Sequence, residues 1–110
     1  MKLPYRKNAI VPLEKLTEYI LSEIHVVGKL KAKFFRAAGF NETNVSILEK
    51  SLINIALTEK VKDIVVSVHG KKYIVDGKIQ TPNGKIIQLR TVWILEPNQK
   101  TPRFITTYPV

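Results

Sequence analysis

The chain has 110 residues, of which 45% are hydrophobic and 25% are charged, and this length predicts one domain with a modest core of its own. It contains no cysteine, which excludes disulfide bonds, thiol nucleophiles and cysteine-ligated metal sites. Lys and Arg number 18 against 9 Asp and Glu, and the resulting net charge of +9 favours a polyanionic partner: nucleic acid, an acidic protein or a membrane surface.

The beginning of the chain resembles neither a signal peptide nor a membrane anchor. It is basic, but Pro4 and Pro12 interrupt any apolar segment of the kind that a signal peptide needs. No window approaches the roughly 20 apolar residues that span a bilayer. We therefore expect a cytoplasmic protein with no membrane partner.

The first 60 residues are predicted to form an irregular lead-in followed by helices. Residues 1–11 show no period, and Pro12 suits the first turn of a helix because that turn does not need its missing N–H. Apolar residues then recur at helical spacing as far as about Ile24. The helical part is therefore expected to cover residues 12–60, and a first helix begins it directly after the lead-in.

Two further helices are predicted after Gly28. The first covers about residues 29–38 and ends at Gly39, which suits the position just after a helix. Its expected apolar side consists of Leu30, Phe34, Ala37 and Ala38, with Phe35 flanking it. The second follows Asn44, a good N-cap residue, and runs to about Lys60. Its apolar stripe consists of Val45, Leu48, Leu52, Ile55 and Ala56.

After Lys60 the apolar period changes from about 3.6 to 2, which predicts strands over residues 61–109. The four expected strands are 61–68, 71–80, 85–96 and 103–108. Asn83-Gly84 between the second and third is a strong hairpin signal. Because helices precede strands, the predicted class is α+β: two or three N-terminal helices packed on a four-stranded antiparallel sheet, in a single domain of residues 1–110.

One face of this sheet is expected to carry two threonines. Alternation places Thr91 beside Trp93 on the third strand, and Thr106 on the corresponding face of the fourth. Threonine is common in strands, where its hydroxyl can find a backbone partner. The alternative is that both hydroxyls line a pocket beside Trp93.

Basic residues concentrate in two stretches. The first follows His25 without any acid, and consists of Lys29, Lys31, Lys33 and Arg36. It is either a solvated helix face or a cationic helix N-terminus that holds a phosphate, with His25 titrating near neutral pH. The second stretch contains a single acid, Asp76, and its basic members are Lys71, Lys72, Lys78, Lys85 and Arg90.

The remaining chemistry argues against a metal or cofactor site. The acidic residues are scattered, only two histidines occur, and no glycine-rich phosphate loop is present. An enzyme of this composition would use imidazole, ammonium, guanidinium and hydroxyl groups. Cleavage of RNA by its own 2′-OH needs a base, a fixed cation and an acid, and an aromatic ring such as that of Trp93 can stack on a base.

Two segments together resemble a family of small bacterial domains catalogued as of unknown function. The motif His-x-x-Gly-x-x-Lys-Ala lies in HVVGKLKAKFFRAAGF, and Thr-Val-Trp and Thr-x-Tyr-Pro follow in the strands. The resemblance covers about residues 12–109. The family occurs alone and in polymorphic-toxin-like contexts, and it resembles the barnase–EndoU–colicin–RelE (BECR) ribonuclease group.

This resemblance implies helices followed by a four-stranded sheet, ribonuclease activity without a cofactor, and a small acidic, SH3-like antitoxin protein encoded nearby as partner. It implies His25 as general base or acid, Lys31 as the cation for the phosphate, and Thr91 and Thr106 as positioning groups. The expected RNA-binding side chains are Lys29, Arg90, Trp93 and Arg103. Val26 stands where the family has a proline.

The leading hypothesis is a metal-independent ribonuclease toxin of a toxin–antitoxin pair, with RNA, tRNA among the candidates, as substrate. A second reading is a non-catalytic basic module that binds RNA or an acidic protein. A third is an interaction domain whose exposed sheet edge accepts a partner strand.

Overall fold

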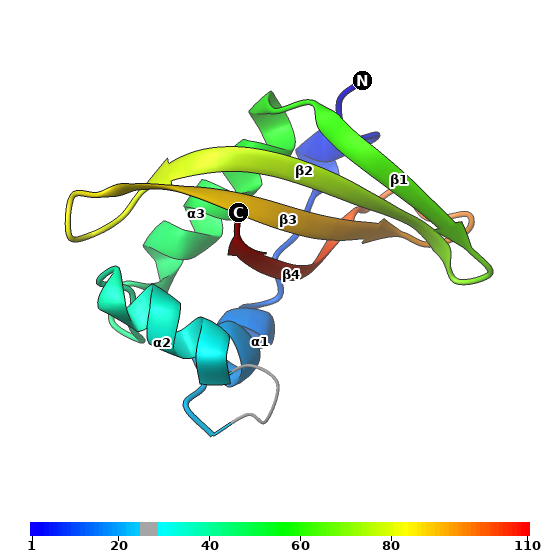
Figure 1. Cartoon of the computed structure of the whole chain (residues 1–110). Helices are drawn as coiled ribbons and strands as arrows, with labels where there is room; N and C mark the ends of the chain where they lie inside the picture. The colour runs from blue at the N-terminus through cyan, green and yellow to red at the C-terminus, as the bar shows by residue number, and fades with distance from the viewer. Residues whose placement is uncertain (25–28) are drawn as a thin grey trace.

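The computed structural model describes residues 1–24 and 29–110 and shows an α+β fold, as predicted. Its sheet contains β1 (Val61–Ser67), β2 (Gly70–Gln80), β3 (Ile86–Leu95) and β4 (Arg103–Pro109). Each strand pairs antiparallel with the next, in the order β1-β2-β3-β4. The helices gather on one side of this meander, with α1 and α2 below β4 (Figure 1).

The longest helix, α3 (Val45–Thr58), packs against β2. Its expected apolar stripe is confirmed, since Leu48, Leu52 and Ile55 are buried. Close packing requires glycine on the sheet, because a Cβ at Gly77 would lie 2.8 Å from Ile55. Asn44 precedes the helix, but its side chain binds the Gly39 carbonyl and the Asn41 N–H instead of capping α3.

The lead-in is ordered by contacts with the sheet. A short 3₁₀ turn, η1 (Arg6–Asn8), lies within it, and Leu3 and Val11 are buried in the core on either side. The Met1 carbonyl accepts a hydrogen bond from the N–H of Val61. The irregular segment therefore contributes to the core. The sequence did not indicate this, because the apolar residues of the segment show no helical or strand spacing.

The first helix is shorter than predicted and changes its winding. It begins as α1 (Leu13–Lys15) and continues as a π-helical turn, η2 (Leu16–Ile20). The N–H of Leu21 donates to the Leu16 carbonyl, five residues earlier, over 2.7 Å. Wide turns of this kind often occur at functional sites, and this one carries Tyr19.

The helix α2 (Lys29–Ala37) ends one residue before its predicted end and buries a different side than predicted. Leu30, expected in the core, is 75% exposed, whereas Phe35, expected to flank the stripe, has no exposed surface. Phe34 is half-buried and meets Phe35 edge-on, with ring centroids 5.2 Å apart. One residue is about 100° of helical turn, so a small rotation of this short helix selects between adjacent apolar side chains.

The turn between β2 and β3 fixes the end of α2. The backbone N–H of Asn83 donates to the Ala38 carbonyl over 3.3 Å, and its side-chain amide donates to the Ala37 carbonyl over 3.2 Å. Gly39 follows the helix with φ of 102°, as its predicted position requires. The hairpin thus holds α2 against the sheet.

A bulge corrects the predicted face of β4. Trp93 pairs with Phe104, but Thr91, two residues before Trp93, pairs with Thr107, three residues after Phe104. The extra residue makes Thr107, and not Thr106, the buried neighbour of Thr91. The prediction that Thr91 and Thr106 share a face is wrong, because a one-residue shift reverses the alternation beyond it.

Candidate functional site

Lys31, Tyr19 and Thr106 meet where α2 approaches β4, and we call them the lysine cluster. The Lys31 Nζ donates to the Thr106 Oγ1 over 2.6 Å and to the Tyr19 Oη over 2.8 Å. The two hydroxyl oxygens lie 3.3 Å apart, within hydrogen-bonding distance. Three segments that are distant in sequence therefore place a cation and two hydroxyl groups within one small, half-buried site.

Aromatic rings restrict the lysine further. Its Nζ lies 4.9 Å from the ring centroid of Tyr19 and 5.6 Å from that of Tyr108. A cation near the face of an aromatic ring is attracted by the ring quadrupole. The rings and hydrogen bonds together hold the ammonium group in one position.

The cluster makes the phenol of Tyr19 more acidic. Burial on its own raises the pKa of Tyr19, but hydrogen bonds with Lys31 and Thr106 and the positive charges of Lys31 and Lys15 outweigh this effect and lower that pKa below the ordinary 10.0. Tyr19 is therefore a better proton donor than a free phenol.

Two of the predicted site residues lie in the core. Thr91 and Trp93 have no exposed surface. The Thr91 hydroxyl donates to the Val75 carbonyl over 2.6 Å and accepts the indole N–H of Trp93 over 2.8 Å. These partners satisfy both polar groups, so Thr91 supports the sheet and the indole of Trp93 offers no open face for a base.

Arg90 and Arg103 are already engaged with acids. The Arg90 guanidinium binds both carboxylate oxygens of Asp76, over 2.9 and 3.0 Å. The hydrogen bonds and charge of Asp76, with a smaller contribution from Tyr108, raise the pKa of Arg90 despite the opposing effect of burial. Arg103 forms an exposed ion pair with Glu96 over 3.0 Å.

Of the other two predicted residues, the structure describes Lys29 and does not describe His25. Lys29 is exposed at the first position of α2, on the same helix as Lys31. His25 lies outside the described residues, so its predicted catalytic role remains a prediction.

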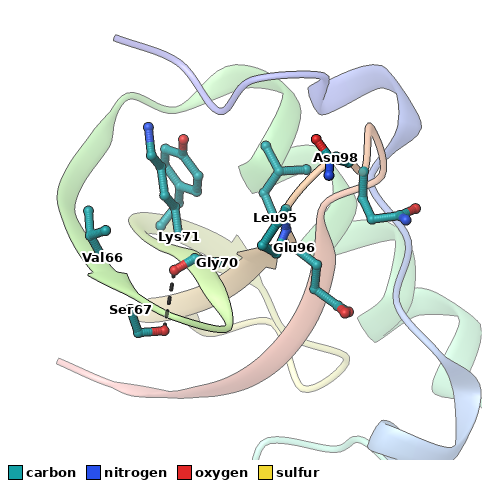
Figure 2. A pocket seen from close by; sticks show the side chains of 10 residues that line it. Val66, Ser67, Gly70, Lys71, Leu95, Glu96 and Asn98 are labelled. Atoms are coloured by element: carbon teal, nitrogen blue, oxygen red, sulfur yellow. Dashed lines mark hydrogen bonds between the residues drawn. The ribbon is translucent and has the colours of Figure 1, made fainter.

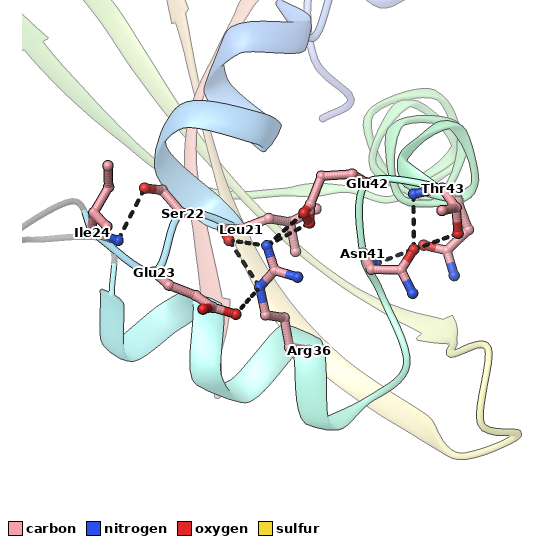
Figure 3. A network of polar contacts seen from close by, with 9 residues as sticks. Leu21, Ser22, Glu23, Ile24, Arg36, Asn41, Glu42 and Thr43 are labelled. Carbon is pink, nitrogen blue, oxygen red and sulfur yellow. Dashed lines mark hydrogen bonds and ion pairs between the residues drawn. The ribbon is translucent and has the colours of Figure 1, made fainter.

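A network around Arg36 holds the two helical segments of the site together (Figure 3). Its guanidinium donates two hydrogen bonds to the Leu21 carbonyl, directly after the π turn, over 2.8 and 3.0 Å. It also forms ion pairs with Glu42, over 2.5 Å, and with Glu23, over 3.0 Å. Arg36 thereby fixes the end of the segment that carries Tyr19 relative to α2.

Sequence reasoning missed Tyr19 and Tyr108 as site residues. Tyr19 stands beside an apolar stripe, and nothing in the sequence signals the π turn that directs it toward Lys31. Tyr108 lies in the Thr-x-Tyr-Pro motif, two residues after Thr106. Residues two apart in a strand point to the same face, and this alternation was the available signal that Tyr108 lies near Thr106.

Neither a metal centre nor a spanning helix was found in the described ranges. Within residues 1–24 and 29–110, no three His, Cys, Asp or Glu side chains are grouped so that they could hold a metal ion. In the same residues, the helices are too short or too polar to cross a membrane.

Comparison with known families settles the membership of the chain. The family model "Domain of unknown function (DUF6883)" matches residues 2–110. The chain belongs to this family. This agrees with the resemblance to a bacterial family of unknown function, while the link of that family to the BECR group stays a prediction.

Solved structures show where the same fold occurs. A chain of a contact-dependent growth inhibition toxin–immunity protein complex from Klebsiella pneumoniae 342 superposes with a TM-score of 0.75 at 15% identity, covering 96% of each chain. At this identity the similarity concerns the fold. None of the curated proteins compared with the chain matches it.

Proposed function

We propose that this member of the DUF6883 family is a metal-independent ribonuclease that acts as the toxin of a toxin–antitoxin pair. The observation that carries the proposal is the lysine cluster, in which the Lys31 Nζ lies 2.6 Å from one hydroxyl oxygen and 2.8 Å from another. A fixed ammonium group beside two hydroxyl groups suits a phosphate whose charge increases during reaction.

In the proposed reaction, Lys31 and Thr106 hold the scissile phosphate. The ammonium group has three N–H donors, of which two bind Tyr19 and Thr106, so the third is available for a phosphate oxygen. The Thr106 hydroxyl can accept from Lys31 while it donates to a second phosphate oxygen. These contacts strengthen as negative charge accumulates on the phosphate.

Proton transfer is assigned to His25 and Tyr19. A base removes the proton of the 2′-OH as its oxygen bonds to phosphorus, and an acid protonates the 5′-oxygen as its bond to phosphorus breaks. His25 serves as the base in this proposal, and Tyr19, with its lowered pKa, serves as the acid. The products are a 2′,3′-cyclic phosphate and a free 5′-hydroxyl group.

The toxin assignment is supported by the charge and by the fold. A net charge of +9 suits binding to RNA and also to an acidic neutralising protein. The similar fold comes from a toxin–immunity complex, which supports a small protein partner. The proposal includes a cytoplasmic site of action and a small acidic, SH3-like antitoxin as that partner.

The test compares two lysines of α2 in the full chain. The purified protein is incubated with total RNA in EDTA, together with Lys31→Met and the matched control Lys33→Met, whose lysine is exposed on the same helix. We expect cleavage by the wild type and by Lys33→Met, and a loss of about 100-fold or more in Lys31→Met.

Intact RNA with the wild type would refute the ribonuclease. If RNA instead binds with strong salt sensitivity and is not cleaved, the non-catalytic RNA-binding module is the correct reading. Equal cleavage by Lys31→Met would remove the lysine cluster from the mechanism.

A further inference from the structure

The strand β1 forms an open edge of the sheet. It pairs with β2 on one side, and Val61 at its start pairs with Met1. Every residue from Lys62 to Ser67 is exposed. Edge strands of this length present backbone N–H and C=O groups to which another strand can add.

After Lys62 and Asp63, most of the exposed side chains along this edge are apolar. Val65 and Val66 lie within β1, and Val66 and the following Val68 are 70% and 89% exposed. Proteins usually protect a sheet edge with charged residues, proline or a covering segment. An uncovered apolar edge is therefore typical of a surface that binds another chain.

A hollow of about 340 Å³ adjoins this edge (Figure 2). It lies at the end of the sheet near the turn between β1 and β2. Its lining includes the apolar or aromatic side chains of Val66, Tyr73 and Leu95 and the charged side chains of Lys71 and Glu96. Strand-adding interfaces combine backbone pairing with pockets for alternate side chains of the added strand. The hollow is placed to receive one such apolar side chain.

The charges around the edge select the kind of partner. Lys60 and Lys62 stand at the start of β1, and Lys71 and Lys72 at the start of β2, against Asp63 as the acid within β1. A second copy of the chain would bring the same lysines and a net charge of +9 into contact. A segment with carboxylates and apolar side chains fits the surface instead.

We propose that the β1 edge and the adjoining hollow bind an extended, acidic segment of a partner protein, which adds as a fifth strand beside β1. This proposal rests on the proposed function, because it assigns a binding site on this chain to the acidic partner protein named there. Because β1 and β4 are opposite edges of the sheet, this surface lies away from the lysine cluster.

The test uses a synthetic peptide on the full-length protein. The probe is Glu-Val-Glu-Ile-Glu-Val-Glu, with Lys-Val-Lys-Ile-Lys-Val-Lys as the charge-reversed control, and binding is followed by backbone amide NMR. We expect the acidic peptide to shift the amides of β1 and of the hollow, and the basic peptide to shift none of them. RNA cleavage should continue with the acidic peptide bound, so this result is independent of the ribonuclease assay.

Two equally exposed side chains provide the matched variants. Val66→Asp places a negative charge at the hollow, and Ile86→Asp places one at the start of β3; each of these side chains is 70% exposed, so both variants should fold. We expect Val66→Asp to weaken peptide binding about tenfold or more, and Ile86→Asp to change it less than about twofold.

Three results would overturn the proposal. The first is the absence of any shift at millimolar acidic peptide. The second is a set of shifts centred on Lys31 and Tyr19. The third is a concentration-dependent dimer whose interface is β1, which would identify a second copy as the occupant.

Discussion

At the scale of single residues, the fold changes the acidity of Tyr19. Lys31 contacts its phenol directly, and Thr106 lies beside it. We expect Tyr19 to ionise below the ordinary pKa of 10.0, and Lys31→Met to raise its pKa. Ultraviolet titration of the wild type, of Lys31→Met and of Tyr19→Phe isolates this phenol, and an unchanged titration in Lys31→Met would contradict the geometry.

The same ionisation links Tyr19 to stability. Its folded pKa is depressed, so the folded state favours the phenolate. The resulting stabilisation is present above the unfolded pKa and is lost as the pH falls through the lowered folded pKa. The free energy of unfolding of Tyr19→Phe relative to wild type should therefore change between neutral and alkaline pH, which denaturant titrations at both pH values measure.

Thr91 provides a prediction about structure at the residue scale. Thr91→Val would leave the buried indole N–H of Trp93 without its acceptor, at a cost of roughly 1–3 kcal/mol in the free energy of unfolding. Thr91→Ser keeps the hydroxyl and should cost less, as denaturant titration of both variants would show. If Thr91→Val folds with wild-type stability but loses RNA cleavage, Thr91 has the catalytic role that the sequence suggested.

At the scale of elements, Arg36 connects the π turn, α2 and the loop after it. Its hydrogen bonds lower the pKa of the Glu42 carboxyl below the ordinary 4.5, which burial only partly opposes. A carboxyl group whose pKa is lower in the folded state stabilises the fold at pH values above its unfolded pKa. This contribution disappears as the pH falls through the folded pKa. The stability difference between wild type and Glu42→Gln should therefore shrink in acid, and a difference independent of pH would contradict the ion pair.

The elements were predictable where local pattern decides them. Periodicity located α3 and the strands, and Asn83-Gly84 located the hairpin, because these signals are local. The side of α2 that faces the core was not predictable, since Phe34 and Phe35 are both apolar and the docking of the whole helix selects between them. The bulge in β4 also depends on its pairing with β3, which the sequence of β4 alone does not contain.

The candidate site was predictable in part from the motif positions of the family resemblance. Lys31 and Thr106 were named from the sequence, and the structure places their polar atoms 2.6 Å apart. Thr91 was grouped with them by strand alternation, which the bulge interrupts. Tyr19 was missed because the π turn that orients it has no recognisable sequence signal.

At the scale of the whole molecule, charge should control contact with RNA. A chain of net charge +9 releases counterions when it binds phosphates, so its affinity should fall steeply as salt rises. The slope of log affinity against log salt, measured with Lys31→Met to prevent turnover, should be about −0.7 per neutralised phosphate of single-stranded RNA. An affinity independent of salt would contradict an electrostatic interface.

Cleavage that depends on the 2′-OH is the central claim, and one measurement addresses it directly. The full chain is incubated in EDTA with an RNA oligonucleotide and with the same oligonucleotide carrying 2′-deoxyribose throughout. The account predicts that the RNA is cut to fragments ending in a 2′,3′-cyclic phosphate and that the deoxy oligonucleotide stays intact. Equal cleavage of both, or no cleavage of the RNA by excess protein, would contradict it.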